Sequence, residues 1–189
     1  MQMSYDLLFA SSNKNKFDEA ENITSKFGLK LKFLKSHLQE IQANTLEEIA
    51  RHKAIQAFSI CSKPVIVEDA GLFIKSLNGF PGPYSSFVFD TIGNKGILRL
   101  VSMQRSATFR SIIAYCQGPN DVHFFSADVD GTIAKKEQGK NWGFDPIFIP
   151  SGKNKPYSQL VEKNQISHRY LALKKFVNWY LNKKRSSDL

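Results

Sequence analysis

The segment P-V-I-V-E-D-A-G at residues 64–71 decides the fold. Val65, Ile66 and Val67 form a β-branched apolar run that is too short for a helix, and such a run predicts a buried central strand. Glu68 and Asp69 follow directly, at the carboxyl edge where open α/β sheets usually bind ligands. The segment therefore predicts a sheet whose binding site lies beside two adjacent carboxylates.

Strands and helices alternate irregularly on both sides of this segment. Thr45, with Glu48 three residues later, forms a capping box that opens a helix. Alternating apolar and polar residues over 107–116 and 123–129 predict an antiparallel hairpin, with a turn at 130–131. The predicted strands are 5–10, 29–33, 65–67, 107–116, 123–129 and 147–149. One helix is predicted to begin at residue 14, and three others are predicted over 45–61, 94–103 and 166–181.

This irregular order predicts the α/β class, because strict strand–helix alternation is missing while local antiparallel pairing is present. We expect an elongated mixed β-sheet flanked by helices, with a central substrate cleft. The length of 189 residues fits a single domain of two lobes that share one core, over residues 1–185, followed by a C-terminal tail over 186–189.

Composition narrows the function classes. The chain carries 26 Lys and Arg against 17 Asp and Glu, a net charge of +9 that attracts nucleic acids, membrane surfaces or small phosphorylated substrates. No apolar run approaches the ~20 residues of a membrane helix. Cys61 and Cys116 lack a CxxC neighbour, so neither a disulfide framework nor a zinc site is predicted. We expect a cytoplasmic protein without a membrane partner.

Familiar nucleotide and hydrolase motifs are missing from the sequence. It contains no GxxxxGK[ST], GxGxxG or GxSxG, which argues against Walker ATPases, Rossmann oxidoreductases and α/β-hydrolases. The four histidines show no metal-ligand spacing. Any chemistry must therefore come from other segments.

The loop S-S-N-K-N-K at residues 11–16 joins a predicted strand to a helix N-terminus. Backbone N–H groups and the positive end of a helix dipole favour a phosphate there, and Lys16 would add a charge. A simple Ser/Asn helix cap with solvated lysines explains the loop equally well. The loop alone leaves both interpretations open.

The two carboxylates after the central strand suggest a hard divalent cation. Mg²⁺ prefers carboxylate oxygens and bridges to substrate phosphates, and Glu40 could complete such a site. A turn aspartate beside a salt-bridged glutamate is the alternative for Glu68 and Asp69. Further along, W-G-F-D-P at residues 142–146 places aromatic rings in a loop, where they could stack on a nucleobase or pack in the core.

Taken in order, these segments resemble the inosine triphosphate pyrophosphatase family. The family's [ST]-x-N-x-x-K loop matches S-S-N-K-N-K at 11–16, and its E-D-[ST]-G-L segment matches E-D-A-G-L at 68–72. Its L-x-G-x-P-G-x-Y-S segment matches L-N-G-F-P-G-P-Y-S at 77–85. W-G-F-D-P-I-F at 142–148 and S-H-R at 167–169 complete a series that runs from Phe9 to Phe176.

This resemblance implies hydrolysis of ITP, dITP and XTP to the monophosphate and pyrophosphate, with Mg²⁺, in a homodimer that cleanses the nucleotide pool. It implies Asp69 as proton acceptor, and Glu40 and Asp69 as metal ligands with Glu68 assisting. The substrate-binding residues it implies are Ser11, Ser12, Asn13, Lys14, Asn15 and Lys16 in the triphosphate loop, Lys53 and Ala70 beside the phosphates, and Trp142, Gly143, Phe144, Asp145, Lys163, His168 and Arg169 around the base.

The sequence departs from the family pattern at two positions, and two alternative functions remain open. Ser12 stands where many family members have Gly, and Ala70 replaces a frequent Ser or Thr. One rival is a sister pyrophosphatase that acts on another modified nucleotide, although the W-G-F-D-P and S-H-R segments argue against it. The other rival is a basic RNA-binding module, whereas the family resemblance implies no nucleic-acid partner. From the resemblance, a change at Lys16 should weaken all nucleotides alike, while Arg169 should govern base choice.

Overall fold

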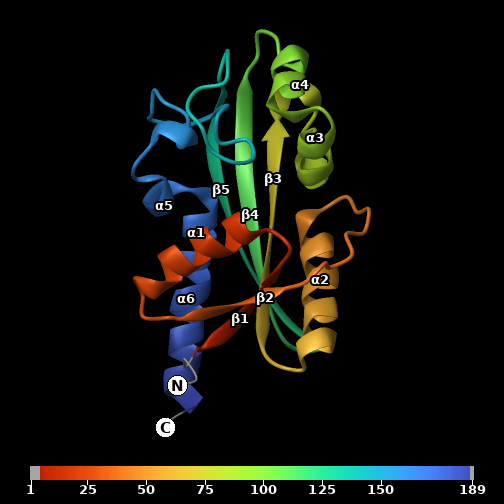
Figure 1. The fold of residues 1–189 in the computed structure, drawn as a ribbon, viewed down its shortest axis with the longest axis vertical. Helices are drawn as coiled ribbons and strands as arrows, with labels where there is room; N and C mark the ends of the chain where they lie inside the picture. Colours follow the sequence, from red (N-terminus) through yellow and green to blue (C-terminus); the bar gives the residue numbers. More distant parts are fainter. Residues whose placement is uncertain (1–4, 188–189) are drawn as a thin grey trace.

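A six-stranded mixed sheet runs along the molecule in the computed structural model, which describes residues 5–187 (Figure 1). The strand order is β2-β1-β3-β4-β5-β6; β2, β1 and β3 are parallel, and β3 to β6 are antiparallel. The predicted α/β class with a mixed sheet is confirmed. The strands are β1 (Leu7–Ser11), β2 (Leu31–Lys35), β3 (Val65–Ile74), β4 (Ser106–Gly118), β5 (Asp121–Ile133) and β6 (Phe148–Pro150).

Helices cover both faces of the sheet. α1 and α6 pack on one face, where the buried cluster includes Ile66 and Ile113, and α2 packs on the other, where it includes Val67 and Ile112 (Figure 1). The α-helices are α1 (Lys14–Ser25), α2 (Leu46–Cys61), α3 (Ser85–Thr91), α4 (Gly93–Leu100), α5 (Lys163–Ile166) and α6 (His168–Ser187), and 3-10 turns span Lys75–Leu77, Gly82–Tyr84 and Tyr157–Gln159.

Local sequence signals explain where the first two helices begin. Asn13 caps α1, because its side chain accepts hydrogen bonds from the backbone N–H groups of Asn15 and Lys16. Thr45 and Glu48 form the reciprocal capping box at the start of α2. Both predicted starts, and the predicted end of α2 at Cys61, are confirmed.

The short first strand creates an opening in the sheet. β1 pairs with β3 only at Val65 and Ile66, whereas β4 pairs with β3 along all ten residues to Ile74. The middle of β3 therefore has β4 on one side and no strand on the other among residues 5–187. Beyond this opening, a separate buried cluster that includes Leu72, Phe148 and Tyr157 supports the far half of the molecule.

The central strand is much longer than the predicted 65–67. Glu68 and Asp69 lie within β3 rather than after it, because ion pairs with buried cations allow charged side chains in a central strand. The predicted turn at 130–131 is also wrong, since both residues belong to β5. Gly131 is required there by close packing: a Cβ atom would lie 2.2 Å from the Ile149 carbonyl oxygen of β6.

Other boundaries shift by smaller amounts. β2 begins at Leu31 because the N–H of Leu29 still bonds to Thr24 in the turn that closes α1. α3 has no counterpart in the sequence prediction, since Ser85 and Val88 alone are buried within it and give no clear helical period. α4 begins one residue before the predicted start at 94 and ends three residues before the predicted end at 103. β6 is shifted by one residue toward the C-terminus relative to the predicted strand.

The last helix is longer than its apolar pattern. α6 begins at His168 and continues to Ser187, so the tail predicted over 186–189 begins inside the helix. Residues 188 and 189 of that tail, and residues 1–4, lie outside the described part of the chain. Among the helices within residues 5–187, none combines the length and the apolar character that crossing a bilayer requires.

Candidate active site

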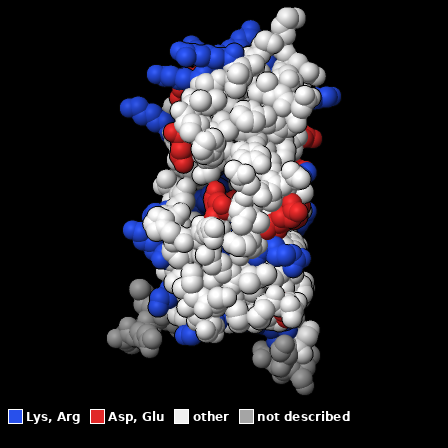
Figure 2. Space-filling view, turned by 90° about the vertical axis from the view of Figure 1, so that its right-hand side faces the viewer, with Lys and Arg blue, Asp and Glu red and all other residues white. Residues whose placement is uncertain are grey.

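A cleft of about 520 Å³ occupies the opening beside β3. The surface is hollowed at mid-height on the face shown in Figure 2, and acidic and basic side chains meet there. Most of the predicted site residues line the cleft: Ser11, Ser12, Asn13, Asn15, Lys16, Glu40, Lys53, Glu68, Asp69, Ala70, Trp142, Gly143, Phe144, Asp145, His168 and Arg169. Segments that are far apart in the sequence therefore meet at one site.

The loop after β1 forms one wall, and its polar atoms are largely engaged with each other. Ser11 Oγ accepts from the N–H of Asn13 at 3.0 Å, and Asn13 Oδ1 accepts from the N–H groups of Asn15 and Lys16 at 2.9 and 3.3 Å. Lys14 is the exception to the prediction, because it does not line the cleft. Its ammonium group pairs with Asp18 on the outer surface of α1.

Glu68 and Asp69 point to opposite faces of the sheet, as neighbouring strand residues must. Glu68 Oε2 lies 3.0 Å from Lys16 Nζ on the α1 side, whereas Asp69 Oδ1 lies 3.2 Å from Lys53 Nζ of α2. The two adjacent carboxylates therefore have different cationic partners, and the role of Glu68 as an assisting metal ligand stays a prediction. Within residues 5–187, no three His, Cys, Asp or Glu side chains are grouped to hold a metal ion.

Asp69, Lys53 and Glu40 form a cluster on the α2 face. Lys53 Nζ contacts Glu40 Oε1 at 2.5 Å as well as Asp69, so two carboxylates share one ammonium group. Burial raises the pKa of Asp69, and Glu40 and Glu68 add to this effect while Lys53 and Lys16 oppose it. Burial opposes the charge of Lys53, but Asp69 and Glu40 raise its pKa. This cluster holds a basic carboxylate beside a fixed positive charge.

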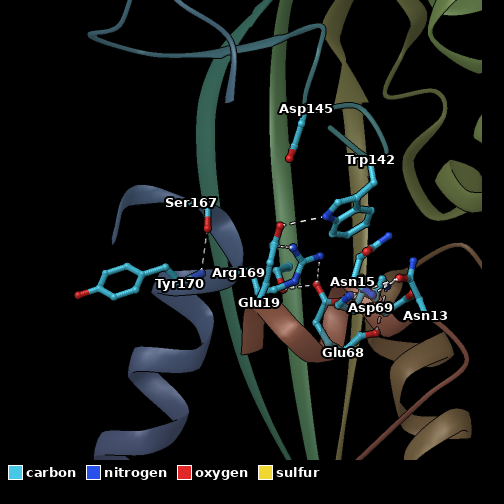
Figure 3. A network of polar contacts seen from close by, with 12 residues as sticks. Asn13, Asn15, Glu19, Glu68, Asp69, Trp142, Asp145, Ser167, Arg169 and Tyr170 are labelled. Atoms are coloured by element: carbon cyan, nitrogen blue, oxygen red, sulfur yellow. Dashed lines mark hydrogen bonds and ion pairs between the residues drawn. The ribbon is translucent and has the colours of Figure 1, made fainter. Parts of the chain in front are cut away.

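Glu68 lies at the centre of a second cluster, on the α1 and α6 face (Figure 3). Its carboxylate is fully buried and contacts Lys16 Nζ, Arg169 Nη2 at 3.1 Å and the Ser111 hydroxyl, which donates at 2.8 Å. Burial alone would raise the pKa of Glu68, but Arg169 and Lys16 outweigh burial and hold that pKa well below its usual range. Glu68 is therefore ionised throughout the neutral range.

Glu19 extends this cluster to the tryptophan loop. It accepts from Trp142 Nε1 at 3.0 Å and from Lys163 Nζ at 2.5 Å, and it pairs with Arg169 (Figure 3). Lys163 also contacts Asp145 Oδ2 at 2.5 Å, so it reaches the site through Asp145 without lining the cleft. The sequence interpretation missed Glu19, although it follows Lys16 by three residues and so shares its helix face.

Aromatic rings complete the far end of the cleft. The imidazole of His168 stacks on Phe109 with ring centres 3.9 Å apart, and Phe144 meets Phe89 edge to face at 5.5 Å. Both ring nitrogens of His168 are buried and have no hydrogen-bond partner among the described residues. Burial, aided by Arg169, lowers the pKa of His168 well below its usual value, so the ring is neutral. A neutral imidazole offers one donor and one acceptor to a ligand.

The Arg169 guanidinium lies 5.0 Å from the ring centre of Trp142. Together, these groups can bind a polar ring at one end of the cleft and an anion at the other. The sequence profile of the Ham1 family matches residues 7–179. The chain belongs to the Ham1 family.

Curated relatives of this Ham1 protein are similar along almost their whole length. A protein of Methanopyrus kandleri named dITP/XTP pyrophosphatase is 44% identical over 181 residues, which cover 93% of this chain and 96% of the relative. A protein of the same name from Methanothermobacter marburgensis is 46% identical, with 91% and 94% covered. The solved structure of a HAM1 protein from Coxiella burnetii matches with a TM-score of 0.80 at 28% identity, covering 95% of this chain and 100% of that one. The resemblance found in the sequence is confirmed.

Proposed function

We propose that this protein hydrolyses deaminated purine nucleoside triphosphates, namely ITP, dITP and XTP, to the monophosphate and pyrophosphate. One observation carries the proposal most directly: a single cleft brings Lys16, Lys53 and Asp69 together with Trp142 and His168. The names of the curated relatives support the same reaction. Their agreement argues against a sister pyrophosphatase acting on a different nucleotide class.

Asp69 is the candidate proton acceptor. Its raised pKa makes the carboxylate a better base than an exposed aspartate, and it can take the proton of a water that attacks the α-phosphorus. Lys53, held between Asp69 and Glu40, and Lys16, at the start of α1, supply positive charge near the phosphates. These lysines would stabilise the charge that develops on the departing pyrophosphate.

Glu40 and Asp69 are the residues that fit a magnesium ion. Both are hard oxygen donors that line the cleft, and each leaves one carboxylate oxygen outside its contact with Lys53. Glu40 is 55% exposed, which leaves room for the waters that Mg²⁺ retains. The ion, when bound, would neutralise phosphate charge. Glu68 is left out of this proposed set, because its carboxylate pairs with Lys16 and Arg169 on the other face of β3.

The far end of the cleft supports selection of the base. Arg169 and one nitrogen of His168 offer donors, Lys163 acts through Asp145, and the 6-keto oxygen of hypoxanthine or xanthine is an acceptor. Adenine presents an amino group at that position, which would leave buried donors unpaired at about 1–3 kcal/mol each. The arrangement therefore favours ITP and XTP over ATP.

Assembly and location belong to the same proposal. We infer a homodimer, supported by the family resemblance and by exposed apolar side chains such as Phe87 and Met103, which are 68% and 95% exposed. We infer a cytoplasmic location, which suits the two free cysteines Cys61 and Cys116. Light scattering coupled to size-exclusion chromatography tests the dimer.

A substrate panel tests the reaction. Each of ITP, dITP, XTP, GTP, ATP and CTP is incubated with Mg²⁺, and pyrophosphate and orthophosphate are measured separately. We expect pyrophosphate from ITP, dITP and XTP. Orthophosphate as the primary product, or preference for a pyrimidine nucleotide, would contradict the proposal. Steeply salt-dependent RNA binding without ITP cleavage would favour the RNA-binding alternative.

A further inference from the structure

Glu68 is a buried anion shared by two cations that serve different parts of the cleft. Lys16 Nζ lies 3.0 Å from Oε2, and Arg169 Nη2 lies 3.1 Å from Oε1. The Glu68 side chain is 0% exposed, so water cannot replace either partner. A charge buried in this way must stay neutralised by its neighbours.

The two cations come from different helices that line the cleft. Lys16 lies in the first turn of α1, and its Nζ also donates to the Glu68 carbonyl oxygen at 3.3 Å. Arg169 opens α6, pairs with Glu19 through Nη1 and lies over the Trp142 ring (Figure 3). Its Nε is buried without a hydrogen-bond partner among the described residues. Glu68 thus links Lys16 to Arg169 directly.

We propose that Glu68 is a positioning residue that couples the phosphate end of the cleft to the base end, through Lys16 and Arg169. A phosphate that attracts Lys16 withdraws part of the charge that neutralises Glu68. The carboxylate then depends more on Arg169 and draws Nη2 closer, which fixes the remaining N–H groups of the guanidinium for the base. This inference rests on the proposed function.

Lys53 provides the comparison within the same cleft. It lines the cleft as Lys16 does, but it pairs with Asp69 and Glu40 on the other face of β3. If Lys16 were only a phosphate contact, as the sequence suggests, the two lysines would affect all nucleotides alike. The ion pair with Glu68 predicts that Lys16 alone also affects base choice.

The first experiment measures the coupling between two half-ligands, which are the two parts of the substrate supplied as separate molecules: inosine for the base and tripolyphosphate for the phosphates. Calorimetry gives the affinity for inosine with and without saturating inorganic tripolyphosphate, using the full-length protein. In the wild type we expect tripolyphosphate to tighten inosine binding about fivefold or more, and in Glu68→Gln we expect no tightening. Asp128→Asn, which changes only an exposed ion pair with Arg110, is the control and should retain the coupling.

The second experiment does not depend on the Glu68 variant folding. For Lys16→Gln we expect the ratio of kcat/KM for ITP to that for ATP to fall about fivefold or more, while Lys53→Gln should lower both values in equal proportion. Three results would each overturn the inference. They are independent binding of the two half-ligands in the wild type, coupling that persists in Glu68→Gln, and an ITP:ATP ratio of kcat/KM that is unchanged in Lys16→Gln. If the wild type releases pyrophosphate from ITP but shows no coupling, the proposed function stands and this inference fails. If it neither cleaves ITP nor binds inosine, both fail.

Discussion

Replacing Asp69 with asparagine removes one negative charge and little else. The side chain is 10% exposed, asparagine has nearly the same size, and Lys53 keeps Glu40 at 2.5 Å as a partner. Because an amide cannot accept the proton of the attacking water, turnover should fall by roughly 10²–10⁴, or about 3–5 kcal/mol in the activation barrier. Pyrophosphate release from ITP at saturating substrate measures this loss.

The same substitution should not destabilise the protein. The pKa of Asp69 is raised in the folded state, mainly by burial, so the folded protein binds this proton more tightly than the unfolded chain does. Stability therefore falls as the pH rises from the ordinary aspartate pKa through the raised one. At pH 7 without added metal, Asp69→Asn should melt at the wild-type temperature or above it, and the difference should vanish as the pH approaches the ordinary aspartate pKa.

Two results would refute this reasoning. Near-normal turnover in Asp69→Asn would remove Asp69 as the proton acceptor. A clearly lower melting temperature, together with lost activity, would show that the carboxylate supports the fold instead. Asp128→Asn is the matched control, because it makes the same chemical change at an exposed position and should alter neither measurement.

Three further outcomes are expected. Arg169→Ala should raise the KM for ITP and shrink the ITP:ATP ratio of kcat/KM; an unchanged ratio in steady-state assays would remove Arg169 from base recognition. Gly71→Ala should lower the free energy of unfolding by about 1–3 kcal/mol in urea, since its Cβ would lie 2.5 Å from the Gly82 carbonyl oxygen; full stability would show that the loop can move away. Removing divalent metal with EDTA should abolish pyrophosphate release without changing the melting temperature, because Glu40 lies at the surface; a large drop would mean that metal is part of the fold.

Local signals allowed much of the site to be predicted from the sequence. The Thr45 cap fixes the start of α2 and thereby the position of Lys53, which lies about two helical turns after the cap. The loop after β1 and the start of α6 at His168 are likewise set by nearby residues. Each of these features depends on contacts within a few residues along the chain.

Features that depend on distant partners were not predictable in this way. From the sequence, β3 is predicted to end before Glu68, because nothing nearby in the sequence shows that Lys16 and Arg169 will neutralise that charge. Once the strand continues, its alternation separates Glu68 from Asp69. Gly131 resembles a turn residue because its true neighbour, the backbone of Ile149, is 18 positions away in the chain (149 − 131).

The separation of Glu68 and Asp69 by the sheet has a practical consequence for protein engineering. Arg169, which we propose selects the base, approaches the cleft from the α1 and α6 face of β3, whereas Asp69 and Lys53, which we propose act in hydrolysis, approach it from the α2 face. A mutant library confined to the first face could broaden or change the accepted nucleobase while the hydrolytic residues keep their positions. Such a library must leave the length of β3 intact, since inserting one residue before Glu68 would exchange the two faces.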